Sequence, residues 1–206
     1  MISHKYKCIY IHIPCTAGTA LEQIIDNRDW WGYNSPHKHL TACQSKKLYK
    51  EYWEEYFKFG FVRDPFARHA SISKFEMFRG DNDRTSKVST STISKCIKFY
   101  KSKFGAPLTG EYDFRFDNDK SIPLRNTPVI ENSVYQNIYN EELDFIGKVE
   151  NLQRDLFFVF DKIKFPEQTI PSFKPNANNK YCDIYTDELR QEVENLYKKD
   201  IIYFDY

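Results

Sequence analysis

The chain has 206 residues, of which 41% are hydrophobic and 29% charged, and its formal net charge is +1. This length is enough for one sizeable core, and we expect a single domain over residues 1–206. A charge near zero excludes bulk binding to nucleic acid or to a membrane surface, and no apolar run reaches the roughly 18 residues of a membrane-spanning helix.

Short apolar runs and longer amphipathic stretches alternate along the chain. In chain order we expect a strand over 7–13, helices over 18–27 and 41–56, a strand over 57–62, helices over 65–79 and 93–104, a strand over 143–149, and helices over 152–163 and 187–199. Cap residues support three of the helix starts: Thr41 with Gln44, Asp64 before Pro65, and Thr186. Because strands alternate with helices, we predict an α/β fold with a central, mostly parallel sheet flanked by helices.

Two polar segments predict loops. Residues 81–92 (DNDRTSKVSTST) carry no hydrophobic period, which predicts a mobile surface loop. Residues 164–180 are rich in proline and asparagine and predict a second long loop. The sequence shows no internal repeat and no linker, so both loops are assigned to the single predicted domain.

The turn after the first predicted strand reads PCTAGTA, residues 14–20. In an α/β sheet such turns lie at the carboxyl ends of the strands, where ligands bind. The first N–H groups of the following helix lack helical partners, so an anion fits there, with Gly18 allowing close approach and Thr16 and Thr19 offering hydroxyl groups. The alternative is that Pro14 and Gly18 only shape a turn. The sequence lacks the G-x-x-x-x-G-K-[ST] phosphate loop, which counts against an ATP or GTP enzyme.

A second strand-to-helix turn, FVRDPFARHASISKF at residues 61–75, follows the same logic. Arg63 stands at the carboxyl end of the predicted strand, and its guanidinium can bind a phosphate through two parallel hydrogen bonds. Ser71 lies about two helical turns further on and can face the same ligand. The alternative is an Arg63–Asp64 pair beside an ordinary helix cap.

Together, HIPCTAGTAL and FVRDPFARHASISKF resemble the paired signatures of the sulfotransferases that use 3′-phosphoadenosine-5′-phosphosulfate (PAPS). The nearest branch is the carbohydrate type, which includes heparan and chondroitin sulfotransferases and bacterial relatives. The resemblance extends to HKHLTA, GKVENLQRDL and DELRQEVENLYKKDIIYFDY, so it covers most of the chain in order. It implies a P-loop-like fold and transfer of a sulfuryl group from PAPS to a hydroxyl of a carbohydrate or similar alcohol. The product nucleotide would be 3′-phosphoadenosine-5′-phosphate (PAP), and no metal is expected.

The resemblance also implies which residues hold the nucleotide. The 5′-phosphosulfate end is expected at Cys15, Thr16, Ala17, Gly18, Thr19 and Ala20. The 3′-phosphate is expected at Arg63 and Ser71. The Pro/Asn-rich loop is expected to close over the nucleotide through Lys174 and Asn176.

Transfer to an alcohol needs a base, and we place that base at His39. The segment KHLTA resembles the family segment that carries a catalytic histidine, and an imidazole suits proton transfer near neutral pH. His37 is the competing base, and both histidines can instead be ordinary loop residues. Glu111 and Asp113 are further candidates, although nothing local points to them.

Cys15 departs from the family pattern HIPKTAGT, in which a lysine at this position is held to stabilise the leaving oxygen. A thiol has no such charge, and the loss of one preorganised donor costs roughly 10²–10³ in rate. Three explanations stay open: an engineered substitution in an active enzyme, a natural cysteine compensated by Lys38 or another cation, or a PAPS/PAP-binding module without turnover. A nucleotide or sugar kinase is a further alternative, disfavoured by the missing phosphate-loop lysine.

The sequence carries fewer signals for the acceptor and the compartment. Four aromatic residues can stack on sugar rings, although such residues more often pack in a core: Trp30, Trp31, Tyr33 and Trp53. The five cysteines include no C-x-x-C pair and predict mainly reduced thiols in a cytoplasmic protein. A domain of the Golgi lumen that lacks its membrane anchor is the alternative.

Overall fold

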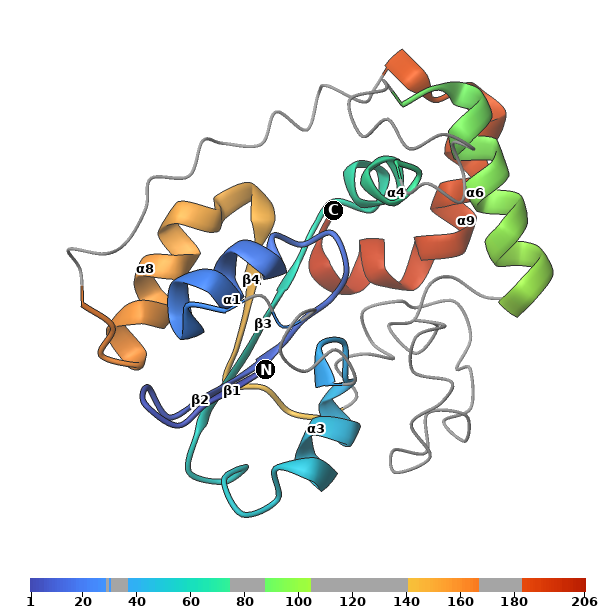
Figure 1. Cartoon of the computed structure of the whole chain (residues 1–206). Coiled ribbons are helices and arrows are strands. Elements are labelled where there is room, and N and C mark those ends of the chain that lie inside the picture. The colour runs from blue at the N-terminus through green and yellow to red at the C-terminus, as the bar shows by residue number, and fades with distance from the viewer. Residues whose placement is uncertain (29, 31–36, 75–87, 105–140, 167–182) are drawn as a thin grey trace. The chain divides into compact units, whose positions relative to one another are not determined.

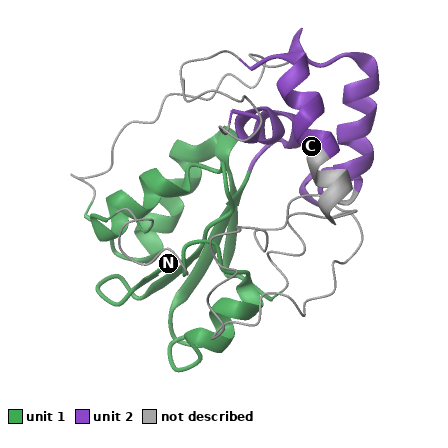
Figure 2. Ribbon diagram, turned by 45° about the vertical axis from the view of Figure 1, so that its right-hand side comes forward, with its two compact units in different colours: residues 1–62, 109–127, 135–176 green, residues 63–108, 128–134, 177–206 purple. Residues whose placement is uncertain are grey.

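The computed structural model describes residues 1–28, 30, 37–74, 88–104, 141–166 and 183–206. These residues form two compact units (Figure 2). The first unit comprises the described residues within 1–62 and 141–166, and the second comprises those within 63–104 and 183–206. The single domain over residues 1–206 stays a prediction.

The first unit is built on a four-stranded sheet with the strand order β1–β2–β3–β4 (Figure 1). The strands are β1 (Ile2–Ser3), β2 (Cys8–Ile11), β3 (Phe57–Val62) and β4 (Phe145–Lys148). β2, β3 and β4 run parallel, while β1 pairs antiparallel with β2. The α/β class and the mostly parallel sheet are therefore confirmed. β1 was not predicted, because two residues are too few to show an alternating pattern.

Helices cover both faces of this sheet. They are α1 (Gly18–Asp26), α3 (Ala42–Leu48) and α8 (Leu152–Lys162), with a short 3₁₀ helix η5 (Val149–Asn151) before α8. α1 and α8 lie together on one face and α3 lies on the other (Figure 1). The core on the α1 and α8 face is mainly aliphatic and aromatic, and includes Tyr10, Leu21, Phe59, Phe61 and Val159. Its burial provides the main stabilisation of the sheet and positions the turn between β2 and α1.

The helix predicted over 41–56 is correct at its start and wrong at its end. Thr41 and Gln44 form the expected capping box, in which Thr41 Oγ1 accepts from Gln44 N at 3.2 Å and the Gln44 side chain accepts from Thr41 N at 2.8 Å. α3 ends at Leu48, however, and turns follow. The buried ammonium of Lys58 donates to the carbonyl oxygens of Trp53 and Tyr56, both at 3.0 Å. The Lys58 side chain, which comes from β3, thus satisfies two carbonyl groups at the end of this segment. Helix propensity cannot reveal such a tertiary contact.

The second unit consists of three helices that pack on one another: α4 (Pro65–Ile72), α6 (Thr90–Phe104) and α9 (Asp187–Phe204). Asp64 caps α4 by accepting from Ala67 N at 2.7 Å, and Thr186 caps α9 by accepting from Leu189 N at 3.3 Å. Both caps confirm the sequence prediction.

Three boundaries of this unit differ from expectation. α4 ends at Ile72, short of the predicted end at residue 79, and residues 75–79 lie outside the described residues. α6 begins at Thr90, so the predicted loop over 81–92 is wrong at its end, and its residues 81–87 lie outside the described residues. Ser89 N donates to Thr92 Oγ1 at 3.0 Å, which stabilises the first turn of α6. α9 extends beyond the predicted end, because two helical segments meet at Tyr197, whose φ of −111° is not helical. None of the helices among the described residues is long and apolar enough to cross a membrane.

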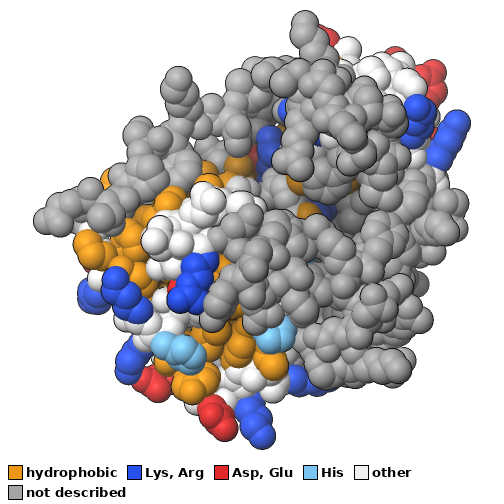
Figure 3. All heavy atoms as spheres, in the orientation of Figure 1, with side chains coloured by type: hydrophobic (Ala, Val, Ile, Leu, Met, Phe, Trp, Pro, Cys, Tyr) orange, Lys and Arg blue, Asp and Glu red, His pale blue; other side chains and the backbone are white. Residues whose placement is uncertain are grey.

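Hydrophobic side chains reach the surface over the region of α8 (Figure 3). Phe157 and Phe158 are 48% and 43% exposed. The Phe158 ring also packs on Phe145 of β4 with centroids 4.6 Å apart, and Lys162 lies over the same ring at 5.3 Å. Neighbouring side chains therefore cover part of this apolar surface, as is usual for scattered exposed rings.

Candidate active site

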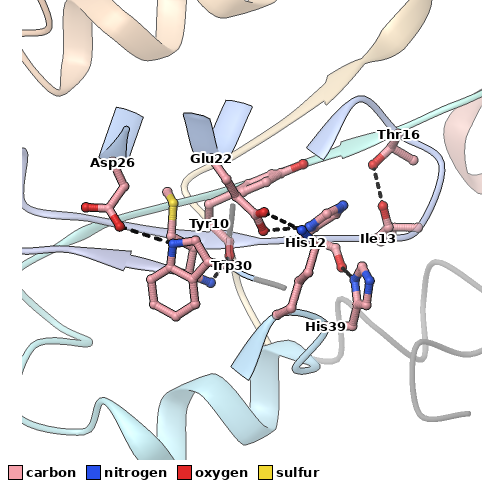
Figure 4. Close-up of polar contacts among 10 residues, drawn as sticks. Tyr10, His12, Ile13, Thr16, Glu22, Asp26, Trp30 and His39 are labelled. Carbon is pink, nitrogen blue, oxygen red and sulfur yellow. Dashed lines mark hydrogen bonds and ion pairs between the residues drawn. The ribbon is translucent and has the colours of Figure 1, made fainter. Parts of the chain in front are cut away.

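The turn between β2 and α1 has two non-glycine residues in the left-handed backbone region. The φ angle is 66° at Cys15 and 65° at Ala17. An L-residue in this region costs about 1–2 kcal/mol, and such outliers gather at functional sites. Thr16 is buried, and its Oγ1 donates to the carbonyl oxygen of Ile13 at 2.8 Å (Figure 4). The hydroxyl proton of Thr16 thus serves the turn itself, whereas the sequence suggested it as a donor to a ligand.

The N-terminus of α1 is suited to an anion. Ala17 occupies the N-cap position, no side chain caps the helix, and no acidic residue stands in its first turn. By helix geometry the N–H groups of Gly18 and Thr19 have no acceptor within α1, and the helix dipole adds partial positive charge. Thr19 is exposed and Ala20 is half-buried. The predicted segment from Cys15 to Ala20 therefore forms one continuous turn that can receive a phosphate or sulfate group.

The imidazole of His12 leaves no room for a side chain at position 18, so glycine is required there. A Cβ atom at this position would lie 1.9 Å from Nε2 and 2.0 Å from Cδ2 of His12. The His12 ring, which is 4% exposed, fills the space where any side chain of residue 18 would go. The sequence suggested Gly18 as a point of close ligand approach, and the structure adds that it seats α1 against β2.

We expect Gly18→Ala to destabilise the protein by about 1–3 kcal/mol, because the new methyl group overlaps the His12 ring. Glycine-to-alanine changes inside helices usually stabilise by about 1 kcal/mol, so the sign itself is diagnostic. Chemical denaturation of Gly18→Ala and of the exposed neighbour Thr19→Ala measures the effect. Equal stability of the two variants would contradict the close contact with His12.

A buried network of charged side chains lies beneath the turn (Figure 4). The carboxylate of Glu22, on α1, accepts from Nδ1 of His12 at 2.7 Å through Oε1 and from Nζ of Lys38 at 2.7 Å through Oε2. The exposures of Glu22 and Lys38 are 0% and 1%. Burial raises the pKa of Glu22, although the hydrogen bond from Lys38 opposes the rise. Because a carboxylate only accepts, Nδ1 of His12 is assigned the proton of this hydrogen bond.

His39 joins this network through the backbone of His12, the residue that directly follows β2. Its Nδ1 contacts the carbonyl oxygen of His12 at 2.9 Å, and the two imidazole rings meet edge to face with centroids 4.4 Å apart. A carbonyl oxygen only accepts, so Nδ1 of His39 donates and Nε2 carries the lone pair of the neutral ring. This is the tautomer that a general base acting through Nε2 needs. His39 is 5% exposed.

The remaining predicted residues of the first unit lie elsewhere. His37, the competing base, is half-buried, and its ring meets Tyr49 edge to face with centroids 6.4 Å apart. Trp30 and Trp53, the candidate sugar platforms, are 3% and 4% exposed, and Trp30 Nε1 donates to Asp26 at 3.2 Å. Both indoles belong to the packed interior, which is the more common of the two roles considered for them. Four further candidates lie outside the described residues: Trp31, Tyr33, Glu111 and Asp113.

The second unit holds the predicted 3′-phosphate residues. Arg63 follows β3 directly and is 8% exposed, and Ser71 is half-buried on α4. Arg68, on the same helix, is fully buried. Burial, and next the charge of Arg68, lower the pKa of His69 to about 3, so this ring is neutral. Its Nδ1 lies 3.2 Å from the hydroxyl oxygen of Tyr197. Lys174 and Asn176 lie outside the described residues.

Sequence reasoning missed His12 and Glu22. Two local signals were present: a histidine at the end of an apolar strand, and an acidic residue between Leu21 and Ile25 on the apolar side of α1. Each signal alone is common. Lys38 was considered as a compensating cation, and the structure pairs its ammonium with Glu22.

A mostly parallel α/β sheet whose strand-to-helix turn opens on a helix N-terminus without a side-chain cap is an arrangement in which α/β proteins can bind anionic ligands. The chain belongs to the sulfotransferase family, whose profile matches residues 1–206. It is 24% identical to carbohydrate sulfotransferase 12 of Mus musculus, over 87% of this chain and 45% of that protein. The chain thus spans about half the length of this curated relative. No solved structure matches it significantly.

The residues present fit the PAPS nucleotide that the family uses. The uncapped N-terminus of α1 suits a phosphosulfate, and the guanidinium of Arg63 with the hydroxyl of Ser71 suits a phosphate. Among the described residues, no group of three histidine, cysteine or acidic side chains is placed to hold a metal ion. The thiol of Cys15 is the one member of the predicted set whose chemistry differs from that of the family pattern.

Proposed function

We propose that this chain transfers a sulfuryl group from PAPS to a hydroxyl of a carbohydrate or a similar alcohol. Membership of the sulfotransferase family supports the reaction, and the name of the mouse relative supports a carbohydrate as acceptor. The structural observation that carries the proposal is the anchoring of His39. Its Nδ1 is fixed on the carbonyl of His12, two residues before the turn that receives the anion.

Each group of the site has a separate task. PAPS supplies the sulfuryl group when bound. The N–H groups at the start of α1 hold its phosphosulfate end, and Arg63 with Ser71 holds the 3′-phosphate. Nε2 of His39 takes the proton of the acceptor hydroxyl, which increases the nucleophilicity of that oxygen. Lys174 and Asn176 are proposed to close over the nucleotide.

Calorimetric binding of PAP in metal-free buffer, together with release of PAP from PAPS in the presence of a glycan panel, tests the proposal. We expect binding without metal and turnover with at least one glycan. Absence of PAP binding would refute the family-based site. Dependence on magnesium and ATP would instead favour a kinase.

We expect Arg63→Ala to weaken PAP binding about 100-fold, because a bidentate charged contact of a buried guanidinium is lost. Binding of adenosine 5′-phosphate, which lacks the 3′-phosphate, should change less than about twofold, since no contact to it is removed. Arg63→Lys keeps the charge and loses the fork, so an intermediate loss of about tenfold is expected.

Calorimetry with both nucleotides measures this selectivity. Arg154→Ala is the matched control, because the side chain of Arg154 is 75% exposed and pairs with Asp155 on α8. An equal loss of affinity for PAP and adenosine 5′-phosphate in Arg63→Ala would assign Arg63 to another part of the nucleotide.

A catalytically impaired PAPS- or PAP-binding module is the second candidate function. Cys15 favours it, because the turn lacks the cation that the family pattern carries there. Tight PAP binding without turnover on any acceptor would select this candidate.

We also propose a cytoplasmic location. The thiol of Cys8 is buried in the core, and the sequence contains no C-x-x-C pair, which together support a reducing compartment. Burial raises the pKa of the Cys8 thiol to about 12, so this cysteine is inert in the core. Microscopy of the tagged full-length protein tests the location.

A further inference from the structure

Four side chains of the first unit form a buried polar cluster, and the proposed chemistry uses only one of them, the imidazole of His39. We call it the Glu22 cluster, and it consists of His12, Glu22, Lys38 and His39. All four are at most 5% exposed. Moving a carboxylate and an ammonium out of water costs more than their attraction returns in many proteins, and apolar replacements are often equally stable. Stability alone therefore does not explain why a charged cluster stands here.

The Glu22 cluster ties three parts of the first unit together. His12 extends β2, Glu22 belongs to α1, and Lys38 lies in the turn before α3. One carboxylate joins all three, since each of its oxygens accepts one hydrogen bond of 2.7 Å. The close fit of the His12 ring against Gly18 adds a fourth point of contact, at the N-terminus of α1.

His39 is held by this arrangement on two sides. Its ring nitrogen Nδ1 is bound to the carbonyl of His12, and its preceding residue, Lys38, is bound to Glu22. The same two residues, His12 and Glu22, therefore set both the position of the turn and the orientation of the imidazole. Partners of this kind fix the tautomer and the direction of a functional histidine.

We infer that Glu22 and His12 are positioning residues of the transferase, which hold His39 so that its Nε2 serves as the base and which set the charge around it. The inference rests on the proposed function. Neither residue is assigned a contact with the nucleotide or the acceptor.

The charges of the cluster act on His39 in a predictable direction. Among the described residues, the titratable groups of this neighbourhood include His12 and Tyr10 from β2 and its extension, Glu22 from α1, and His37 and Lys38 from the turn of His39 itself. They also include the N-terminal amino group of Met1, which interacts with Glu22 and whose pKa burial lowers to about 6. The carboxylate of Glu22 favours the imidazolium form of His39, and the ammonium of Lys38 opposes it. Burial raises the pKa of Tyr10 far above its ordinary value, so the phenol is neutral.

Glu22→Gln tests the inference, because it keeps the shape of the side chain and removes its charge. The loss of the carboxylate and the unopposed ammonium of Lys38 both disfavour protonation of His39. The acid limb of the kcat–pH profile should therefore move to lower pH by about half a unit or more. We expect kcat to fall about tenfold or more at the pH optimum, as for other residues that orient functional histidines, while the Kd of PAP changes less than about threefold.

Asp26→Asn is the matched control, since it makes the same chemical change one helical turn further along α1, where Asp26 accepts from Trp30. This variant should keep the wild-type kcat and pH profile. Glu22→Gln with an unshifted acid limb and wild-type kcat would overturn the inference. A fall in kcat without any shift of the acid limb would mean that Glu22 has only a structural role. This result would also overturn the inference.

A double variant covers the case in which Glu22→Gln does not fold. Glu22→Gln/Lys38→Met removes both charges, which is tolerated better than removal of one. We expect its acid limb to return toward that of the wild type, while kcat stays reduced because the turn is no longer tied. Wild-type kcat in the double variant would overturn the inference.

Titration of the His39 ring by NMR, without any substrate, separates this inference from the proposed function. If the wild-type protein neither binds PAP nor turns over PAPS, the proposed function fails, yet the midpoint of the His39 titration still reports on the cluster. An equal midpoint in the wild type and Glu22→Gln would reject the electrostatic coupling whatever the reaction is.

Discussion

His39→Asn is expected to lower kcat by about 10²–10⁴-fold while the affinity for PAP stays within about twofold. The asparagine amide can still donate to the carbonyl of His12, which the wild-type Nδ1 contacts at 2.9 Å. The substitution therefore preserves the anchor and removes Nε2, the nitrogen assigned to take the proton. Single-turnover release of PAP from PAPS, with the best acceptor of the glycan panel, measures the loss.

His37→Asn is the matched control for this experiment. His37 lies two residues earlier in the same turn, and its described ring contact is with Tyr49. Its substitution should change kcat less than about twofold, because no proton transfer is assigned to it. The reverse result, a large loss at His37 and a small one at His39, would move the base to His37. Similar small losses in both variants would mean that neither imidazole is the base.

The fold could be predicted where the relevant contacts are local. The strand over 57–62 is found as predicted, because its apolar run is short and bounded by polar residues. The caps at Thr41 and Asp64 are likewise confirmed, since each cap is satisfied within three residues. The end of α3 and the bend at Tyr197 were not predictable, because distant parts of the fold decide where these helical segments stop.

The candidate site, too, could be predicted only where its residues are close together in the sequence. The turn from Cys15 to Ala20 is continuous in sequence, so its composition and its position after a strand were enough to predict an anion site there, and that site stays a prediction. The Glu22 cluster is not continuous: Glu22 lies 10 residues after His12 and 16 before Lys38. Their hydrogen bonds exist only once α1 packs on β2. A glutamate in an amphipathic helix is normally assigned to the solvent side, and only the packed structure shows its carboxylate fully buried.

The roles of His39 and Cys15 concern opposite ends of the same transfer. In the proposed reaction the base acts on the incoming hydroxyl, whereas residue 15 is proposed to stand where the departing phosphate gains negative charge. The structure provides buried, oriented groups for the first task. For the second task it provides the dipole of α1, while the ammonium of Lys38 is paired with Glu22 at 2.7 Å. The proposed assignment therefore accounts for removal of the proton better than for stabilisation of the leaving group.

Cys15→Lys is accordingly expected to raise kcat by roughly 10²–10³-fold, the usual value of one preorganised donor at a developing charge. The φ of 66° at position 15 costs a lysine no more than it costs the cysteine, since both are ordinary L-residues, so the turn should keep its shape. The Kd of PAP should improve less than kcat, because the charge on the leaving oxygen is greatest in the transition state. Stopped-time assays of PAP release, with calorimetry on the same samples, measure both quantities.

Cys43→Lys provides the control, because it adds the same charge at another half-buried cysteine, on α3. It should leave kcat unchanged within about twofold. Equal kcat in the wild type and Cys15→Lys would show that another group already supplies the missing charge. Cys15→Lys can also bind PAP tightly and still show no turnover with any acceptor. In that case the loss of catalysis does not come from residue 15 alone, and the chain is better described as a nucleotide-binding module than as a transferase that lacks one cation.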